Sequence, residues 1–172
     1  MSRPIDVVPY DPKWPEIFET LRRRLKAQLG DLAWRIEHVG STAVPGLSAK
    51  PIVDLDVVIH SRDDLAEVIT ALRRLGYAHE GDGGIQGREM FTTPADAPAH
   101  HLYVCATGNR ELARHLVFRD LLRADPMTAR AYAALKADLA ARFRSDRRGY
   151  SEAKTAFIEQ ALCSITNRAP EQ

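Results

Sequence analysis

The sequence is poor in cysteine, balanced in charge and free of long hydrophobic runs, and each of these features excludes a class of protein. Its 172 residues include 2 cysteines, Cys105 and Cys163, in no CxxC pair, which excludes a disulfide framework and a thiolate zinc site. The net charge of +1 argues against a protein that binds mainly to the phosphate backbone of a nucleic acid. No segment approaches the roughly 20 apolar residues of a membrane span, and no signal peptide is recognisable. We therefore expect a cytoplasmic protein with no membrane association.

The hydrophobic pattern predicts an α/β (α+β) fold in which a mixed sheet carries flanking helices. Short β-branched runs predict strands at residues 33–39, 52–59, 77–80, 88–93 and 101–106. Apolar residues at helical spacing predict helices at residues 14–29, 61–75, 109–124, 127–144 and 150–166. Breaks between the last three helices are expected at Asp125-Pro126 and at Gly149. A Ser61/Asp64 capping box is expected to start the second helix.

The chain divides into an α/β part and a helical part. Residues 1–108 are predicted to form the α/β core and residues 109–172 a C-terminal helical part, with a hinge near residues 107–110 and the two packed as one compact unit. Positive charge concentrates in the helical part, because residues 110–154 hold 11 basic and 6 acidic side chains. The helical part is thus the more favourable side for contact with an anion.

Two acids lie in the predicted strand IVDLDVVI (52–59). Because strand side chains alternate, Asp54 and Asp56 share one face, about 7 Å apart along the chain. Unpaired buried carboxylates lose hydration and repel each other, so something must compensate them. A Mg²⁺ or Mn²⁺ ion fits this requirement, since it takes a few carboxylate oxygens and completes its shell with water and phosphate. The alternative is that one acid caps a helix or pairs with an arginine at the sheet edge.

A glycine-serine turn precedes this strand and provides the second half of the predicted site. Gly40, Ser41 and Thr42 offer backbone N–H groups, hydroxyls and room for close approach, which suits a terminal phosphate. Lys50, just before the strand, and Arg88, beside the glycine-rich loop, are placed to meet substrate phosphates.

The string EHVGSTAVPGLSAKPIVDLDV (37–57) resembles the signature of the GrpB family. The resemblance extends to VVPYDPKWPEIFE (7–19), HLYV (101–104), FRDLLRADP (118–126), YAALK (132–136) and YSEAKTAFI (150–158). It implies a nucleotidyltransferase-like core with a helical C-terminal part, and it assigns Gly40, Ser41, Asp54 and Asp56 to phosphate and metal.

Within the helical part, Arg119, Lys136 and Lys154 match positive positions of the family pattern, which could complete a phosphate pocket. The alternative for these cations is a solvated helix face or ion pairs with neighbouring acids such as Asp120 and Asp138.

The chain departs from active nucleotidyltransferases at the third carboxylate, which those enzymes usually take from a later strand. The corresponding segment, HHLYVCA (100–106), contains no acid. His101 is the candidate replacement as ligand or base, or else a structural histidine, and the family commonly has a second histidine where this chain has Tyr103. Glu89, on the preceding strand, is the other candidate acid.

Two functions follow as hypotheses. The first is Mg²⁺-dependent nucleotidyl transfer from a nucleoside triphosphate, or another phosphorylated small molecule, to a small acceptor. The second is a catalytically silent nucleotide- or coenzyme-binding accessory module, because the family also occurs fused to dephospho-CoA kinase. A protein partner or a homodimer is compatible with either hypothesis. Nucleic-acid end-processing is disfavoured by the net charge and by the lack of aromatic-basic interleaving.

Overall fold

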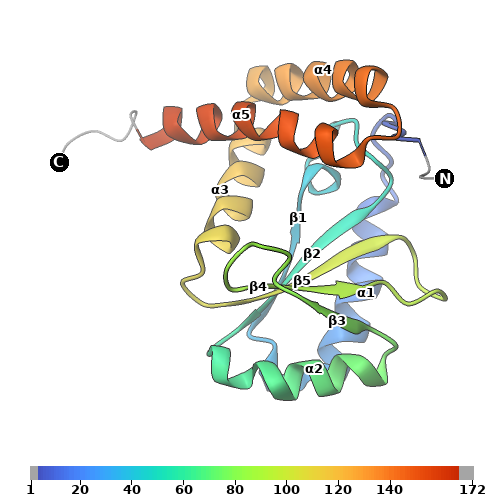
Figure 1. The fold of residues 1–172 in the computed structure, drawn as a ribbon, viewed down its shortest axis with the longest axis vertical. Coiled ribbons are helices and arrows are strands. Elements are labelled where there is room, and N and C mark those ends of the chain that lie inside the picture. The colour runs from blue at the N-terminus through green and yellow to red at the C-terminus, as the bar shows by residue number, and fades with distance from the viewer. Residues whose placement is uncertain (1–3, 167–172) are drawn as a thin grey trace.

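The computed structural model describes residues 4–166, which form a five-stranded mixed sheet with helices around it (Figure 1). The last six residues of the predicted helical part, 167–172, lie outside the described residues. The strands are β1 (Arg35–Val39), β2 (Val53–Ile59), β3 (Ala78–Gly81), β4 (Arg88–Thr92) and β5 (His100–Ala106). The helices are α1 (Trp14–Leu29), α2 (Leu65–Arg74), α3 (Arg110–Ala124), α4 (Pro126–Phe143) and α5 (Arg147–Thr166). The α/β fold class predicted from the sequence is confirmed.

The sheet has the order β1-β2-β5-β4-β3, and only its β2/β5 pair is parallel. The register places Asp54 opposite Val39 on β1 and opposite His101 on β5. Three segments distant in sequence therefore meet at one end of β2: the end of β1, Asp54 itself and the start of β5.

Alternation along β2 separates an apolar face from a polar face. Val53, Leu55 and Val57 are almost fully buried in the main core with α1 and α2, each contributing about 1.5–3 kcal/mol through burial. Asp54 and Asp56 point to the opposite face, where α3 brings its side chains. Figure 1 shows α4 and α5 at one end of the molecule and α2 at the other.

Side-chain caps explain where α2 and α3 begin. The Ser61/Asp64 capping box is present and opens a 3₁₀ turn that leads into α2. Asn109 accepts hydrogen bonds from the N–H groups of Glu111 and Leu112 and so begins α3.

The expected break at Gly149 is wrong, because Gly149 lies inside the first turn of α5. The chain turns instead at Arg144, the C-cap of α4, whose φ is 42°. A Cβ at position 149 would lie 2.7 Å from two ring carbons of Phe143, so glycine permits close approach there.

The helical part contacts the α/β part through apolar and polar groups. Val44 and Leu47, from the loop before β2, are buried with Leu122 of α3 and Tyr132 of α4. The guanidinium of Arg123 donates two hydrogen bonds, of 2.9 and 2.7 Å, to the Ala43 carbonyl oxygen. These contacts bring α3 and α4 against the glycine-serine turn. Within residues 4–166, no helix combines the length and apolar character needed to cross a bilayer.

Candidate functional site

The glycine-serine turn touches the first acid directly. Gly40 has φ 71° and ψ −171°, a region that is essentially restricted to glycine. A Cβ there would overlap Oδ2 of Asp54 and would lie 3.0 Å from its Cγ. Glycine at position 40 is therefore required both by the backbone and by the carboxylate beside it.

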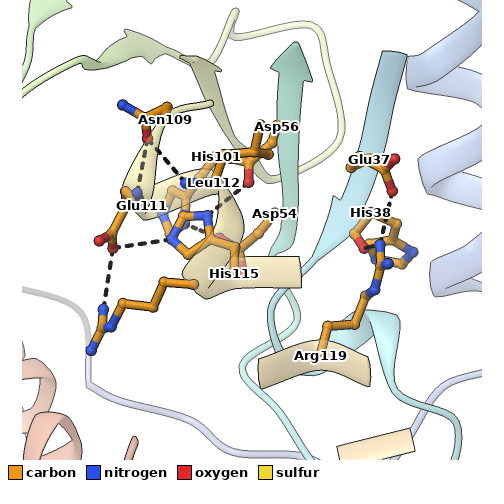
Figure 2. Close-up of polar contacts among 11 residues, drawn as sticks. Glu37, His38, Asp54, Asp56, His101, Asn109, Glu111, Leu112, His115 and Arg119 are labelled. Carbon is orange, nitrogen blue, oxygen red and sulfur yellow. Dashed lines mark hydrogen bonds and ion pairs between the residues drawn. The ribbon is translucent and has the colours of Figure 1, made fainter. Parts of the chain in front are cut away.

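Asp54 is held by a histidine from the neighbouring strand. Its Oδ1 lies 2.7 Å from Nδ1 of His101 (Figure 2), and its side chain is 27% exposed. Because a carboxylate only accepts hydrogen bonds, Nδ1 of His101 is the donor in this contact, and in the tautomer that it fixes Nε2 is the acceptor nitrogen. Sequence reasoning placed these two residues in the site but not in contact with each other.

Asp56 is fully buried and is held by a residue that sequence reasoning missed. Its Oδ2 lies 2.7 Å from Nδ1 of His115 on α3, and Nε2 of His115 lies 3.3 Å from Oε1 of Glu111 (Figure 2). Burial acts to lower the pKa of His115, but its two carboxylate partners raise that pKa to about 9. The hydrogen bond from His115 lowers the pKa of Glu111 to about 2. An imidazolium between two carboxylates thus compensates the buried acid.

This arrangement adds a compensation for the two acids that the sequence did not reveal. Neither Asp54 nor Asp56 pairs with an arginine or caps a helix among the described residues, and each is hydrogen-bonded by a histidine. The only sequence signal for the missed pair was the helical i, i+4 spacing of Glu111 and His115, which says nothing of Asp56.

The donor set nevertheless fits Mg²⁺. Oδ1 of Asp56 is buried without a hydrogen-bond partner in the described structure, and Asp54 lies in the wall of a cavity. Residues 4–166 hold no group of three or more His, Cys, Asp or Glu side chains arranged for a metal ion. Mg²⁺ in phosphate-transferring sites is commonly bound by one or two carboxylates, with water and substrate phosphates completing its shell, so such a group is not required.

A cavity of about 200 Å³ lies beside Asp54. We call it the lysine cavity, because it is lined by Lys50, Lys136 and Lys154. The ammonium groups of Lys50 and Lys154 lie 5.3 and 4.4 Å from the ring centre of Tyr150. Lys136 is 2% exposed and donates hydrogen bonds to the Ser48 carbonyl and, at 2.9 Å, to Oγ of Ser41.

The charge of this lysine cavity is not balanced by acids. Asp54 is the one carboxylate in its described lining, and no ion pair joins the three lysines to a carboxylate within residues 4–166. Burial, with Lys154 nearby, lowers the pKa of Lys136 to about 7. Burial and then Lys50 lower the pKa of Lys154 to about 8, against the attraction of Asp54. An anion entering the cavity would relieve this repulsion.

Thr42 and Arg119, which were also predicted for the site, contact other side chains. Thr42 lines the lysine cavity but is 1% exposed, and its Oγ1 lies 3.0 Å from Nε2 of His38. Arg119 pairs with Glu37 at 2.9 Å and with Asp120 at 2.8 Å, as the structural alternative proposed.

Arg88 and Glu89 do not reach the lysine cavity. Arg88 lies on the same face of the sheet as Tyr103, and its guanidinium carbon lies 4.5 Å from the centre of the Tyr103 ring. Arg88 is not among the residues that line the lysine cavity. Glu89 pairs with Val104 in the sheet and so faces the apolar core, away from Asp54. It is bound there by Arg62 and His79, each at 2.7 Å. Strand alternation therefore removes Glu89 as the third acid of this site.

Comparison with known proteins places this geometry in context. The family model described as GrpB protein matches residues 4–164. The UPF0157 protein YqkA of Bacillus subtilis is 35% identical over 160 residues, which are 93% of this chain and 47% of YqkA. The crystal structure of the conserved protein GrpB from Enterococcus faecalis is 34% identical, with a TM-score of 0.81 over 91% of this chain and 94% of that one.

Two further similarities are more distant. The Cid1 poly(U) polymerase, in its MgGTP-bound crystal structure, is 14% identical, with a TM-score of 0.53 over 79% of this chain and 45% of Cid1. The dephospho-CoA kinase of Mycolicibacterium paratuberculosis is 28% identical over an alignment of 185 positions, which covers 92% of this chain and 45% of the kinase. The chain thus spans about half the length of several relatives it matches. By its family model and by its relatives, this chain belongs to the GrpB family, and its fold is similar to that of the Cid1 poly(U) polymerase.

Proposed function

We propose that this protein transfers a nucleotidyl group from a Mg²⁺-bound nucleoside triphosphate to a small acceptor that carries a hydroxyl or phosphate group. The observation that carries the proposal is the position of Asp54, beside the glycine-serine turn and in the wall of the lysine cavity. The three lysines of that cavity form no ion pair with a carboxylate of the described residues. A polyphosphate chain supplies the negative charge that this cavity lacks, and carboxylates at its edge suit the accompanying cation.

The residues have distinct roles in this reaction. Asp54 and Asp56 hold the cation, which when bound would neutralise phosphate charge during the transfer. Lys50, Lys136 and Lys154 bind and orient the polyphosphate through charge-assisted hydrogen bonds, with Ser41 at the edge of the cavity.

His101 is the candidate base. Asp54 fixes its tautomer, so Nε2 is free to accept the proton of the attacking hydroxyl, and its side chain is 46% exposed. We further propose a cytoplasmic location, because Cys105 and Cys163 are both free thiols and Cys163 is exposed.

The test is calorimetric binding of ATP in the presence of Mg²⁺. Asp54→Asn and Asp56→Asn remove a negative charge with little change of shape, so we expect Mg²⁺-dependent ATP binding to weaken at least tenfold. Glu89→Gln is the matched control, since it neutralises a buried acid on the opposite face of the same sheet. Circular dichroism checks that each variant is folded. Equal ATP affinity in the wild type and both aspartate variants contradicts the proposal.

A silent nucleotide- or coenzyme-binding module is the second candidate. It is favoured by the histidines that already occupy both carboxylates, and by the relatives named dephospho-CoA kinase. On this alternative the protein binds ATP, but a screen of nucleoside triphosphates and acceptors yields no pyrophosphate. Pyrophosphate release that is abolished by Asp54→Asn supports the enzyme instead.

A further inference from the structure

A second cavity lies directly beside the lysine cavity and differs from it in chemistry. Its volume is about 190 Å³, and it shares Ser41, Asp54 and Lys154 with the lysine cavity. Its other walls include the apolar or aromatic side chains of Phe118, Leu122, Tyr132 and Ile158. We call it the aromatic cavity. Phe118 is partly exposed, and its ring meets the buried ring of Tyr132 edge-on, with centroids 5.1 Å apart.

Charge balance distinguishes the two cavities. The aromatic cavity also contains the guanidinium groups of Arg114 and Arg119, but both already have carboxylate partners. Arg114 pairs with Glu111 at 3.2 Å and with Glu159 at 2.7 Å, and Arg119 pairs with Glu37 and Asp120. Lys50 and Lys136, which line the lysine cavity alone, and Lys154, which both cavities share, have no such partners within the described residues. An anionic group is therefore favoured in the lysine cavity, and a flat uncharged ring in the aromatic cavity.

We propose that one nucleoside triphosphate spans both cavities, with its phosphates among Lys50, Lys136 and Lys154 and its base against Phe118. This inference rests on the proposed function and deepens it. Because Asp54 and Lys154 belong to both cavities, they lie where the nucleoside joins the phosphate chain. The phosphorus nearest Asp54 is then the α-phosphorus.

An α-phosphorus beside Asp54 favours transfer of the nucleotidyl group over transfer of the γ-phosphate. The acceptor oxygen forms a bond to the α-phosphorus, the bond from that phosphorus to the bridging oxygen breaks, and its electron pair leaves with pyrophosphate. The acceptor proton passes to Nε2 of His101. The products are a nucleotidylated acceptor and pyrophosphate, and not the nucleoside diphosphate that transfer of the γ-phosphate would release.

The first experiment compares three ligands on the unaltered protein with Mg²⁺ present: ATP, inorganic tripolyphosphate and adenosine. Tripolyphosphate takes only the lysine cavity and adenosine only the aromatic cavity. We therefore expect each to compete with ATP while the two bind together. Mutual exclusion of adenosine and tripolyphosphate overturns the inference without any variant having to fold.

The second experiment separates the cavities by substitution. Phe118→Leu keeps an apolar side chain but removes the stacking face, so ATP affinity should fall about tenfold while tripolyphosphate affinity stays within about twofold. Lys50→Gln, which alters the lysine cavity alone, should weaken both ligands by similar factors. Phe157→Leu is the matched control, because Phe157 stacks on Tyr132 at 5.3 Å but lines neither cavity.

The outcomes distinguish this inference from the proposed function. If Phe118→Leu weakens tripolyphosphate as much as ATP, or leaves both unchanged, the base does not lie against Phe118, and the proposal of a phosphate-binding lysine cavity survives. If the unaltered protein binds neither ATP nor tripolyphosphate, the proposed function fails and this inference fails with it.

Discussion

Gly40→Ala tests whether the glycine-serine turn positions the carboxylate of Asp54, which we propose holds the cation. The added methyl carbon would overlap Oδ2 of Asp54. The backbone fixes the position of that carbon, so a rotation of the methyl group cannot relieve the contact. The Asp54 side chain must therefore move, which stretches its 2.7 Å hydrogen bond to His101. We expect the variant to fold, but with Asp54 displaced from the edge of the lysine cavity.

The magnitude has two parts. A non-glycine residue at φ 71° and ψ −171° costs about 1–3 kcal/mol of backbone strain. Weakening the Asp54–His101 interaction costs about 1 kcal/mol more, at the low end for a charge-assisted bond because both side chains are partly exposed. If the proposed function holds, the effect on the reaction rate is larger, since a misplacement of about 1 Å in a catalytic group can reduce the rate about a hundredfold.

Stability by denaturant titration and ATP binding by calorimetry provide the assay. Gly46→Ala is the matched control, because Gly46 also has a positive φ, of 78°, but no atom lies within 4 Å of its added Cβ. It should lose stability through strain and retain ATP affinity. The decisive measurement is a double-mutant cycle with Asp54→Ala. In that background Gly40→Ala should cost only backbone strain, so purely additive effects would refute the proposed overlap.

Two further predictions concern stability. Lys136 has a pKa of about 7 in the folded protein against 10.5 ordinarily, so the unfolded chain binds more protons between these values and wild-type stability rises with pH across that window. The stability difference between wild type and Lys136→Met should therefore shift in favour of the wild type by about 2 kcal/mol from pH 6.5 to pH 9, and a difference independent of pH contradicts the lowered pKa. Leu55→Ala removes a side chain that is 0% exposed between the two acids, and we expect a loss of about 2–5 kcal/mol in urea unfolding; a loss below about 1 kcal/mol would mean that the apolar face of β2 is poorly packed.

Much of the site's framework is local and could be predicted from the sequence. The alternation of a strand puts Asp54 and Asp56 on one face because successive side chains point to opposite sides, whatever the rest of the chain does. The turn at Gly40 and the capping box at Ser61 are likewise decided within a few residues. The same rule could have excluded Glu89, but only once the pairing of β4 with β5 was known.

The partners of these groups depend on contacts between distant segments. His115 reaches Asp56 across 59 positions and Lys136 reaches Ser41 across 95, and hydrophobic spacing predicts a helix without saying where it packs. The sequence by itself determined which acids, turn and strands the protein has. Tertiary structure alone decided that two histidines accompany the acids, and that three lysines gather without carboxylate partners among the described residues. The physical reason is that side-chain direction is local, whereas charge compensation in a buried site is set by whichever groups packing brings within a few ångströms.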